Sequence, residues 1–287
     1  MNDQNNTLCH YTDLTGLIGI IGSGSFWATN LAFMNDKSEL VHGLDCAKKA
    51  IRFMQPSPLF SDWSQDFTDA IDRIKERDIN DIFTVSFCRN PDLLSQWRGY
   101  GKAQGVSLVL DQTLLVNRFE AFIKRENTKP DKGMRLDHYY MINDSVTYNR
   151  PEETFELKNK LQSHIDGYAQ FVEEVGTDAP DQFAYLQHMI SQVAPFFKHS
   201  GFSEEEEYRI VIRTLCGDNK IKFRTNDKMI IPYIPILLTG ENKLPLREIK
   251  VGPCEDFTLV RKGIELLLTV NGYSDVNITL STIPYRG

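Results

Sequence analysis

The sequence lacks long apolar runs and paired cysteines, and both absences narrow the classes of protein to which it can belong. No segment approaches the ~18 apolar residues that a membrane span requires, and residues 1–6 are polar, whereas a signal peptide is basic and then apolar. The five cysteines form no CxxC pair, which argues against a disulfide framework and against a zinc site. We therefore expect a cytoplasmic protein without a membrane segment and without a bound metal.

The sequence also lacks a glycine-rich phosphate loop and an excess of positive charge. The glycines at positions 99, 101 and 105 do not follow the GxGxxG or GK[ST] spacing of a strand-to-helix nucleotide loop. The formal net charge of −7 argues against a protein whose whole surface binds nucleic acid, although it leaves room for a local basic groove. Because no internal repeat or linker divides the chain, we expect a single domain over residues 1–287.

Four consecutive glutamates at 204–207 run directly into the segment 208–212, which is rich in β-branched residues. Strand alternation predicts that Glu205, Glu207 and Arg209 share one face, where Arg209 can pair with Glu207 while the two carboxylates repel. A solvated acidic loop is the common alternative for such a run. Since this run leads into a strand that reads as buried, we expect at least one carboxylate at the mouth of a cleft, where it is a candidate for chemistry.

The N-terminal part of the chain has a short strand followed by a helix. Residues 8–12 are apolar and β-prone, Asp13 is the expected N-cap of the helix, and the glycines at 22 and 24 end it. His10 lies on this strand with Thr12 on the same face. A single strand histidine is commonly a half-buried structural residue, so the pattern alone leaves structural and functional roles open.

The rest of the chain alternates between predicted strands and helices. Residues 113–198 are predicted to be mostly helical, interrupted by a strand near 144–148, and we expect this insertion to cover one side of the sheet. The aromatic residues of 56–81 have helical spacing and read as core. Further strands are expected at 81–88, 106–111, 220–224, 230–236, 246–253 and 276–281, with helices at 93–101 and 257–271.

Seven short motifs in this order resemble the bacterial family of proteins with domain of unknown function 2971, almost from end to end. That family in turn resembles a distant branch of the ADP-ribosyltransferases. The motifs are His10-Tyr11-Thr12, Phe33-Met34-Asn35-Asp36-x-x-Glu39-Leu40, Ser86-Phe87-Cys88, Leu94-Ser95-x-Trp97-x-x-Tyr100-Gly101, Phe202-x-x-Glu205-x-Glu207-Tyr208-Arg209, Gly252-Pro253 and Ser281-x-x-Pro284-Tyr285-Arg286. This sequence departs from the transferase pattern in having no tyrosine in a strand-Ser-Thr-Ser context.

The resemblance implies an α+β fold with an ADP-ribosyltransferase-like split, mostly antiparallel sheet, and NAD as substrate. It implies that His10 hydrogen-bonds a ribose of NAD, that Trp97 or Tyr100 lines the nicotinamide pocket, and that Glu207 is catalytic. On this basis we expect His10 and Glu207 on adjacent central strands. Glu205 resembles the first member of the paired-glutamate motif, and the expected NAD-binding residues are His10, Tyr11, Thr12, Asn35, Trp97, Tyr100 and Arg209.

By the same resemblance the expected function is NAD-dependent transfer of ADP-ribose to a macromolecule, as a toxin or phage-defence effector that an antitoxin or other partner regulates. We favour nucleic acid, RNA first, over protein as acceptor, because Lys220, Lys222 and Arg224 alternate onto one strand face and further basic residues bracket the loop near 127–133. The alternatives are an NAD glycohydrolase and a non-catalytic nucleotide-binding or interaction module.

Overall fold

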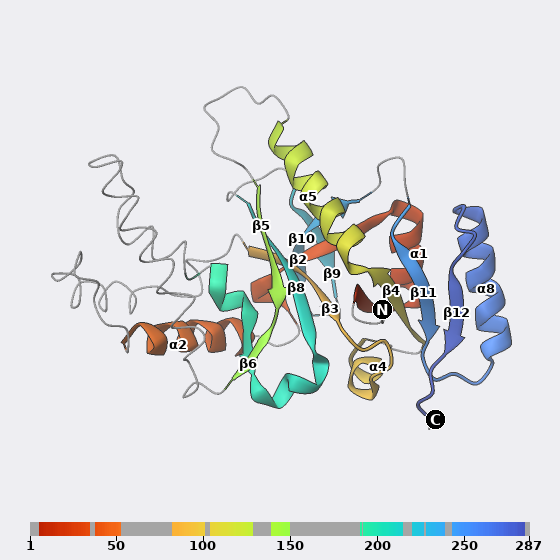
Figure 1. Cartoon of the computed structure of the whole chain (residues 1–287), viewed down its shortest axis with the longest axis horizontal. Helices are drawn as coiled ribbons and strands as arrows, with labels where there is room; N and C mark the ends of the chain where they lie inside the picture. Colours follow the sequence, from red (N-terminus) through yellow and green to blue (C-terminus); the bar gives the residue numbers. More distant parts are fainter. Residues whose placement is uncertain are drawn as a thin grey trace. The chain divides into compact units, whose positions relative to one another are not determined.

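The computed structural model describes residues 6–34, 38–52, 82–100, 104–128, 139–149, 190, 192–214, 220–226, 228–238 and 243–284. The fold is mixed α/β with a mostly antiparallel sheet and several helices (Figure 1). The chain divides into two compact units. The first comprises residues 1–29, 83–145 and 204–287, and the second comprises residues 30–82 and 146–203.

The first unit contains the large sheet and all the predicted site residues except Asn35. Its path runs β12-β11-β4-β1-β3-β2-β10-β9, and the sheet branches at β3, which also pairs with β8, while β8 pairs in turn with β5. Of the pairs with a known register, only β11 with β12 is parallel within this sheet. The strands are β1 (Thr7–Asp13), β2 (Ser25–Asn30), β3 (Ile82–Cys88), β4 (Gly105–Asp111), β5 (Tyr139–Ser145), β8 (Glu207–Thr214), β9 (Lys222–Thr225), β10 (Ile230–Leu237), β11 (Leu246–Val251) and β12 (Asn277–Leu280).

Helix α1 (Leu14–Ser23) connects β1 to β2, and local capping sets both of its ends. Asp13 is the N-cap, and its carboxylate accepts a hydrogen bond of 2.7 Å from the amide of Gly16. Gly24 ends the helix in the left-handed conformation with φ of 61°, which glycine adopts without steric cost. Both the predicted N-cap and the predicted glycine stop are confirmed.

Helices α5 (Gln112–Thr128) and α8 (Phe257–Val270) pack on the apolar face of the sheet. That face carries Leu8, Phe87 and Leu108 from β1, β3 and β4, all nearly or fully buried, and we call it the core face. Figure 1 shows α8 beside β11 and β12. The opposite face carries a smaller apolar cluster of Cys9, Tyr11, Cys88, Trp97 and Val109, and we call it the second face.

The segment expected to be a helical insertion at 113–198 also contributes a strand to the sheet. Its first part is α5, but β5 then pairs with β8 over seven positions, from Tyr139 opposite Thr214 to Ser145 opposite Tyr208. The predicted strand at 144–148 was therefore placed too late in the chain, because Val146 separates β5 from the short β6 (Thr147–Asn149). Residues 150–189 and the aromatic segment 56–81 lie outside the described residues.

The second unit contains a helix and a small two-stranded sheet. Helix α2 (Ser38–Arg52) packs against β7 (Phe197–His199) and the 3₁₀ turn η6 (Ala194–Phe196), and β7 pairs in parallel with β6. Gly43 lies so close to the carbonyl of Ala194 that any Cβ at this position would clash with backbone. Glycine at position 43 therefore permits this close approach of α2.

Candidate functional site

The candidate site is built around a buried ion pair on strand β8. Glu207 and Arg209 stand two positions apart on the second face, while Tyr208 and Ile210 point into the core. Arg209 donates from Nε to Glu207 Oε1 at 2.6 Å and from Nη2 to Oε2 at 2.9 Å. The side chains of Glu207 and Arg209 are only 5% and 1% exposed, so the guanidinium fork holds the carboxylate away from bulk water.

The backbone immediately before Glu207 is strained. Glu206 has φ of 43°, and among the described residues it is the one residue other than glycine with a positive φ. Its carbonyl accepts a 3.1 Å hydrogen bond from the amide of Arg89, which follows β3, so a contact between strands holds the strained conformation. Such backbone costs about 1 to 3 kcal/mol and is frequent at functional sites.

The strained residue also removes Glu205 from the strand. Glu205 ends the 3₁₀ segment η7 (Ser200–Glu205), and β8 begins only at Glu207. The prediction that Glu205, Glu207 and Arg209 share one strand face is therefore wrong for Glu205, because alternation does not continue through the turn at Glu206. The pairing of Arg209 with Glu207 is present as predicted.

His10 does not lie on the same face of the sheet as Glu207. It stands opposite Leu108 and packs edge-on to Phe26 at 5.0 Å and against Phe87 at 5.6 Å, which places it on the core face. Strands β1 and β8 are also not neighbours, because β3 lies between them. The prediction of adjacent strands with both side chains directed at one ligand is therefore wrong.

The contacts of His10 favour a neutral ring. Burial lowers the pKa of His10, and the carbonyl of Ser86 lies 3.0 Å from Nδ1, a hydrogen bond that acts in the opposite direction. A carbonyl can only accept, so Nδ1 carries the proton and the neutral ring has its lone pair on Nε2. Thr12 lies on the same face, and its hydroxyl packs so tightly against Gly16 of α1 that a Cβ there would clash.

Tyr11 and Trp97 belong to the second face, and the centroids of their rings are 4.7 Å apart. The Tyr11 hydroxyl donates to the carbonyl of Asn90 and accepts from the amide of Leu93, both at 2.9 Å. Trp97 lies on α4 (Leu94–Tyr100), is 7% exposed and donates its indole N–H to Asp92. Tyr100, at the end of the same helix, is 39% exposed, whereas Asn35 lies outside the described residues.

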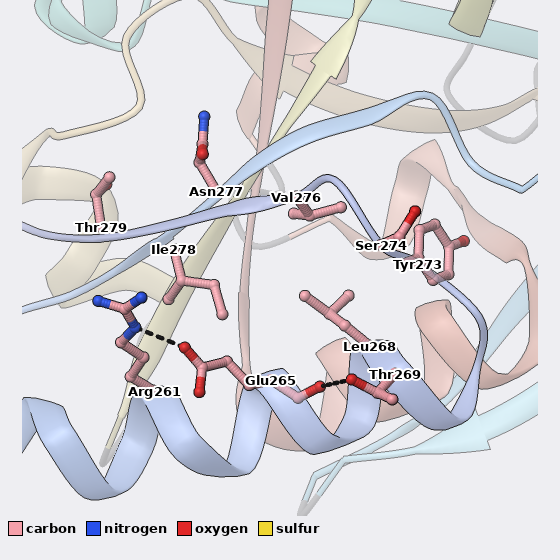
Figure 2. Close-up of a pocket in the computed structure, with 10 residues that line it drawn as sticks. All are labelled: Arg261, Glu265, Leu268, Thr269, Tyr273, Ser274, Val276, Asn277, Ile278 and Thr279. Carbon is pink, nitrogen blue, oxygen red and sulfur yellow. Dashed lines mark hydrogen bonds and ion pairs between the residues drawn. The ribbon is translucent and has the colours of Figure 1, made fainter.

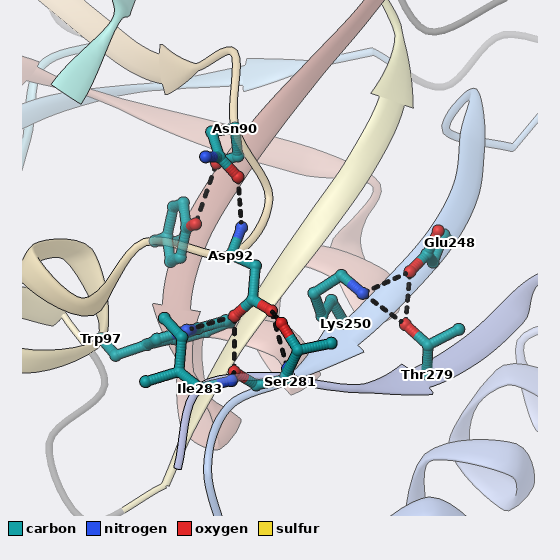
Figure 3. Close-up of polar contacts among 10 residues, drawn as sticks. Asn90, Asp92, Trp97, Glu248, Lys250, Thr279, Ser281 and Ile283 are labelled. Carbon is teal, nitrogen blue, oxygen red and sulfur yellow. Dashed lines mark hydrogen bonds and ion pairs between the residues drawn. The ribbon is translucent and has the colours of Figure 1, made fainter. Parts of the chain in front are cut away.

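Asp92 joins two of the sequence motifs in one hydrogen-bond network (Figure 3). Its Oδ1 accepts from Trp97 Nε1 at 2.9 Å and from the hydroxyl of Ser281, while Oδ2 accepts from the amide and the hydroxyl of Thr282 at 2.8 and 2.9 Å. Partial burial acts to raise the pKa of Asp92, but these hydrogen bonds together lower it. The sequence motifs did not include Asp92, although a carboxylate just before a short helix is a recognisable capping signal.

We expect Asp92→Ala to lower the free energy of unfolding by about 2 kcal/mol, because it leaves Trp97, Ser281 and Thr282 without their charged acceptor. Urea denaturation at neutral pH measures this loss. Asp275→Ala is the matched control, because Asp275 is exposed and accepts from the Ser274 hydroxyl, and it should change stability by less than about 0.5 kcal/mol. Equal effects of the two variants would contradict a structural role for the network.

The lowered pKa of Asp92 also predicts how the contribution of its carboxylate to the free energy of unfolding depends on pH. A carboxyl whose folded pKa lies below its unfolded value stabilises the fold fully above the unfolded value of about 3.9, and the contribution is lost as the pH falls through the folded pKa. The stability difference between the wild type and Asp92→Asn should therefore shrink as the pH falls below about 4. A difference that stays constant over that range would contradict the assignment.

Three buried hydroxyls on the second face have no hydrogen-bond partner in the described part of the chain. They belong to Thr84 and Ser86 of β3 and Ser107 of β4. Thr84 and Ser86 alternate with core residues of β3 and so share the face of Cys88, while Ser107 stands opposite Tyr11. Because buried polar groups are nearly always paired in proteins, these three hydroxyls are exceptions within the described residues.

A separate pocket of 340 Å³ lies between α8 and β12 (Figure 2). Its charged groups, Arg261 and Glu265, pair with each other at 2.7 Å, one helical turn apart. None of the predicted site residues lines it. The pocket therefore lies apart from the ion pair of Glu207 and Arg209 and contributes nothing to the predicted site.

The basic residues expected to form one face divide between two places. Lys222 and Arg224 lie on one face of β9, opposite Tyr233 and Ile231. Lys220 instead binds the buried carboxylate of Glu126 on α5, with its ammonium 5.0 Å from the centre of the Tyr139 ring. The predicted three-residue basic face is therefore wrong for Lys220, which precedes the strand and so does not follow its alternation.

The described residues provide neither a membrane-spanning helix nor a cluster of metal ligands. Within the described ranges, no helix combines the length and the apolar character needed to cross a membrane. The same part of the chain holds no group of three or more histidine, cysteine, aspartate or glutamate side chains placed to bind a metal ion. The expectation that the chemistry needs no metal stays a prediction.

Comparison with known proteins connects this geometry to one family. Neither the curated proteins nor the solved structures contain a match to the chain. The matching family is described as protein of unknown function (DUF2971), and its model covers the segment with α4, β4, α5, β5 and the start of β8. The match covers residues 96–210, so the chain is similar to the DUF2971 family over a segment that includes Trp97, Glu207 and Arg209.

Proposed function

We propose that this protein is an NAD-dependent ADP-ribosyltransferase with an ADP-ribosyltransferase-like split sheet, in which Glu207 is the catalytic carboxylate. The observation that carries the proposal is the state of Glu207, a buried carboxylate that Arg209 holds from two sides, directly after the strained residue Glu206. The ion pair favours the ionised form of Glu207. A fixed negative charge of this kind is what a glycosyl-transfer site requires.

The proposed chemistry breaks one bond and forms one. The bond between nicotinamide and the ribose C1′ breaks, and its electron pair leaves with nicotinamide, which thereby loses its positive charge. The ribose becomes oxocarbenium-like in the transition state, and the charge of Glu207 stabilises it or holds the neighbouring hydroxyl. The acceptor then bonds to C1′ and gives up its proton, for which Glu205, half-buried and on the adjacent turn, is the proposed base.

The second face supports NAD as the ligand through its hydrogen-bonding capacity. The hydroxyls of Thr84, Ser86 and Ser107 have no hydrogen-bond partner among the described residues, and NAD is rich in hydroxyl and phosphate oxygens. Because these hydroxyls are buried, contact with NAD requires the side chains that cover them to move. Tyr100 is the partly exposed aromatic proposed to contact nicotinamide, since Trp97 is buried and its indole N–H is bound to Asp92. Arg209 is assigned to Glu207, so the proposal no longer requires it to bind a phosphate of NAD.

A second candidate is a non-catalytic nucleotide-binding module. Two observations favour it: Arg209 occupies both oxygens of Glu207, and His10 lies on the other face of the sheet. A purely structural ion pair would look the same. An NAD glycohydrolase is a third candidate, because it differs from the transferase only in using water as the acceptor.

Incubation with NAD labelled on the adenylate phosphate and, in parallel, on nicotinamide separates these candidates. RNA, DNA and cell lysate are offered as acceptors in separate reactions. Label on a macromolecule together with free nicotinamide supports the transferase, and free nicotinamide alone supports the glycohydrolase. If neither appears in any reaction, the enzymatic proposals fail and the binding module stands. Growth arrest of cells that express the wild type, but not of cells that express Glu207→Gln, tests the proposed toxin role.

Glu205→Gln should reduce transfer more than NAD cleavage, because its proposed role is toward the acceptor and not toward the glycosidic bond. We expect transfer to fall by about 10²-fold, the usual contribution of a general base, with nicotinamide release changing much less. Glu204→Gln is the matched control, since it removes the neighbouring exposed carboxylate of the same acidic run. Equal losses of transfer and cleavage would assign Glu205 to the first step.

A further inference from the structure

A basic and aromatic surface lies on the second face of β2, β10 and β9, away from Glu207 and Arg209 in the strand order. Tyr233 of β10 stands opposite Thr29 of β2 on one side and Lys222 of β9 on the other. Trp27 lies two positions from Thr29 on β2, and Arg224 lies two positions from Lys222 on β9, so both share this face. We call these residues, Trp27, Thr29, Lys222, Arg224 and Tyr233, the Trp27 face.

The aromatic part of the Trp27 face is a two-ring stack with one ring exposed. Trp27 stacks on Tyr233 with ring centroids 4.5 Å apart and an interplanar angle of 28°. Tyr233 is 8% exposed and forms the buried support, whereas Trp27 is 48% exposed. A large ring fixed by stacking and open to solvent is a platform on which another planar ring can stack at low entropic cost.

Arg224 is held beside this platform. Its guanidinium carbon lies 6.0 Å from the centre of the Trp27 ring, and Nη2 donates a 3.1 Å hydrogen bond to the hydroxyl of Thr29. Lys222 extends from the same face of β9, and both basic side chains are exposed. Arg224 is therefore fixed near an exposed aromatic ring, and Lys222 provides a second exposed cation on the same face.

The local charge has the opposite sign to that of the whole chain. Strands β2, β9 and β10 contain no aspartate or glutamate, and they carry Lys222 and Arg224. The chain as a whole has a formal net charge of −7. A basic strip on an acidic body selects a polyanion locally while the rest of the surface repels it.

We propose that the Trp27 face binds single-stranded nucleic acid, with one base stacked on Trp27 and the flanking phosphates paired with Lys222 and Arg224. A base can reach the face of an aromatic ring only when it is unpaired and unstacked, so a duplex does not fit this surface. The binding needs neither NAD nor Glu207. Its failure is therefore distinguishable from failure of the proposed transferase activity, which the NAD assay tests.

Binding of a fluorescein-labelled oligouridylate of about 12 nucleotides, followed by fluorescence anisotropy without NAD, tests the proposal. Trp27→Ala should weaken binding by roughly 5- to 100-fold, the usual effect of losing one stacked base, while Trp27→Phe keeps a ring and most of the affinity. Phe223→Ala is the matched control, because Phe223 is a 66% exposed aromatic on the other face of β9, opposite Pro232. It should leave binding unchanged.

The dependence of affinity on salt distinguishes the phosphate contacts of Lys222 and Arg224 from the stacking of a base on Trp27. Each phosphate contact contributes about −0.7 to the slope of log affinity against log salt for a single strand, so Arg224→Gln should make the slope less steep by about that amount. Gln keeps a donor for Thr29, which preserves the local fold. A duplex of the same length should bind at least about tenfold more weakly than the single strand.

Three results would overturn the proposal: equal affinity for single strand and duplex, equal weakening by Trp27→Ala and Phe223→Ala, or no binding at low salt. Loss of NAD binding in Trp27→Ala with unchanged oligonucleotide binding would also overturn it and assign the ring to the dinucleotide. Thermal melting of each variant confirms that the fold is intact. If Trp27→Ala does not fold, Trp27→Phe provides the test, because it keeps an aromatic ring and should retain most of the affinity. A large loss of affinity in a folded Trp27→Phe variant would contradict stacking on this ring.

Discussion

Arg209→Met is expected to destabilise the protein by about 3 to 5 kcal/mol, because it leaves the carboxylate of Glu207 buried without its cation. Glu207 is 5% exposed and has both oxygens bound by Arg209. Burying a charge without a partner costs far more than the pair itself contributes, since the pair also lost its hydration on folding. The loss is measured by urea denaturation at neutral pH.

Arg213→Met is the matched control for Arg209→Met. Arg213 lies on the same strand and the same face, but its side chain is only half-buried, so we expect a change of less than about 1 kcal/mol. The double variant Glu207→Leu with Arg209→Met should recover most of the stability, because it removes both charges together. If Arg209→Met is as stable as the wild type, the carboxylate has access to water and the site is more open than the burial indicates.

Glu207→Gln is expected to reduce both nicotinamide release and ADP-ribosyl transfer by about 10²-fold or more, as loss of the principal electrostatic stabiliser should. The amide keeps one oxygen as an acceptor for Arg209, so the strand should remain in place. Initial rates with labelled NAD at saturating acceptor measure the effect. An unchanged rate would remove Glu207 from the proposed mechanism and leave it a structural residue.

Glu126→Gln provides the control for Glu207→Gln. Glu126 is also a buried, ion-paired glutamate, but it lies on α5 and binds Lys220 and Arg125. Glu207→Gln should lose more stability than Glu126→Gln, because it leaves the buried Arg209 without its counter-charge, whereas Lys220 and Arg125 are partly exposed. The rate should fall only in Glu207→Gln. Comparable rate losses in both would show that any buried glutamate affects activity through the fold, in which case no catalytic role follows.

Local chemistry made several elements predictable from the sequence. Helix α1 begins after Asp13 and ends at Gly24 because a carboxylate cap and a left-handed glycine are both encoded within a few residues. Strand β3 was expected at 81–88 and spans Ile82–Cys88 because five of its seven residues are β-branched or aromatic. The ion pair of Arg209 with Glu207 follows from simple alternation along β8.

Tertiary contacts decided what the sequence could not predict. The strand begins at Glu207 and not earlier, because Glu206 adopts a positive φ while its carbonyl is bound to the Arg89 amide from another strand. The sequence also could not predict the face of the sheet on which His10 lies. Strand β1 is apolar on both sides, and alternation alone does not say which side is the core. Pairing of β5 with β8 depends on a strand about 65 positions away in the sequence, as the contact of Tyr208 with Asn143 shows.

The Asp92 network has a consequence for how the sheet assembles. Asp92 and Thr282 are 190 positions apart in the sequence, and the same half of the sheet joins β1 near one end of the chain to β11 and β12 near the other. Contacts of such long range form slowly, because the intervening chain must be ordered first. In a refolding experiment, burial of Trp97 should thus be a late event, and its fluorescence should change after the local helices have formed.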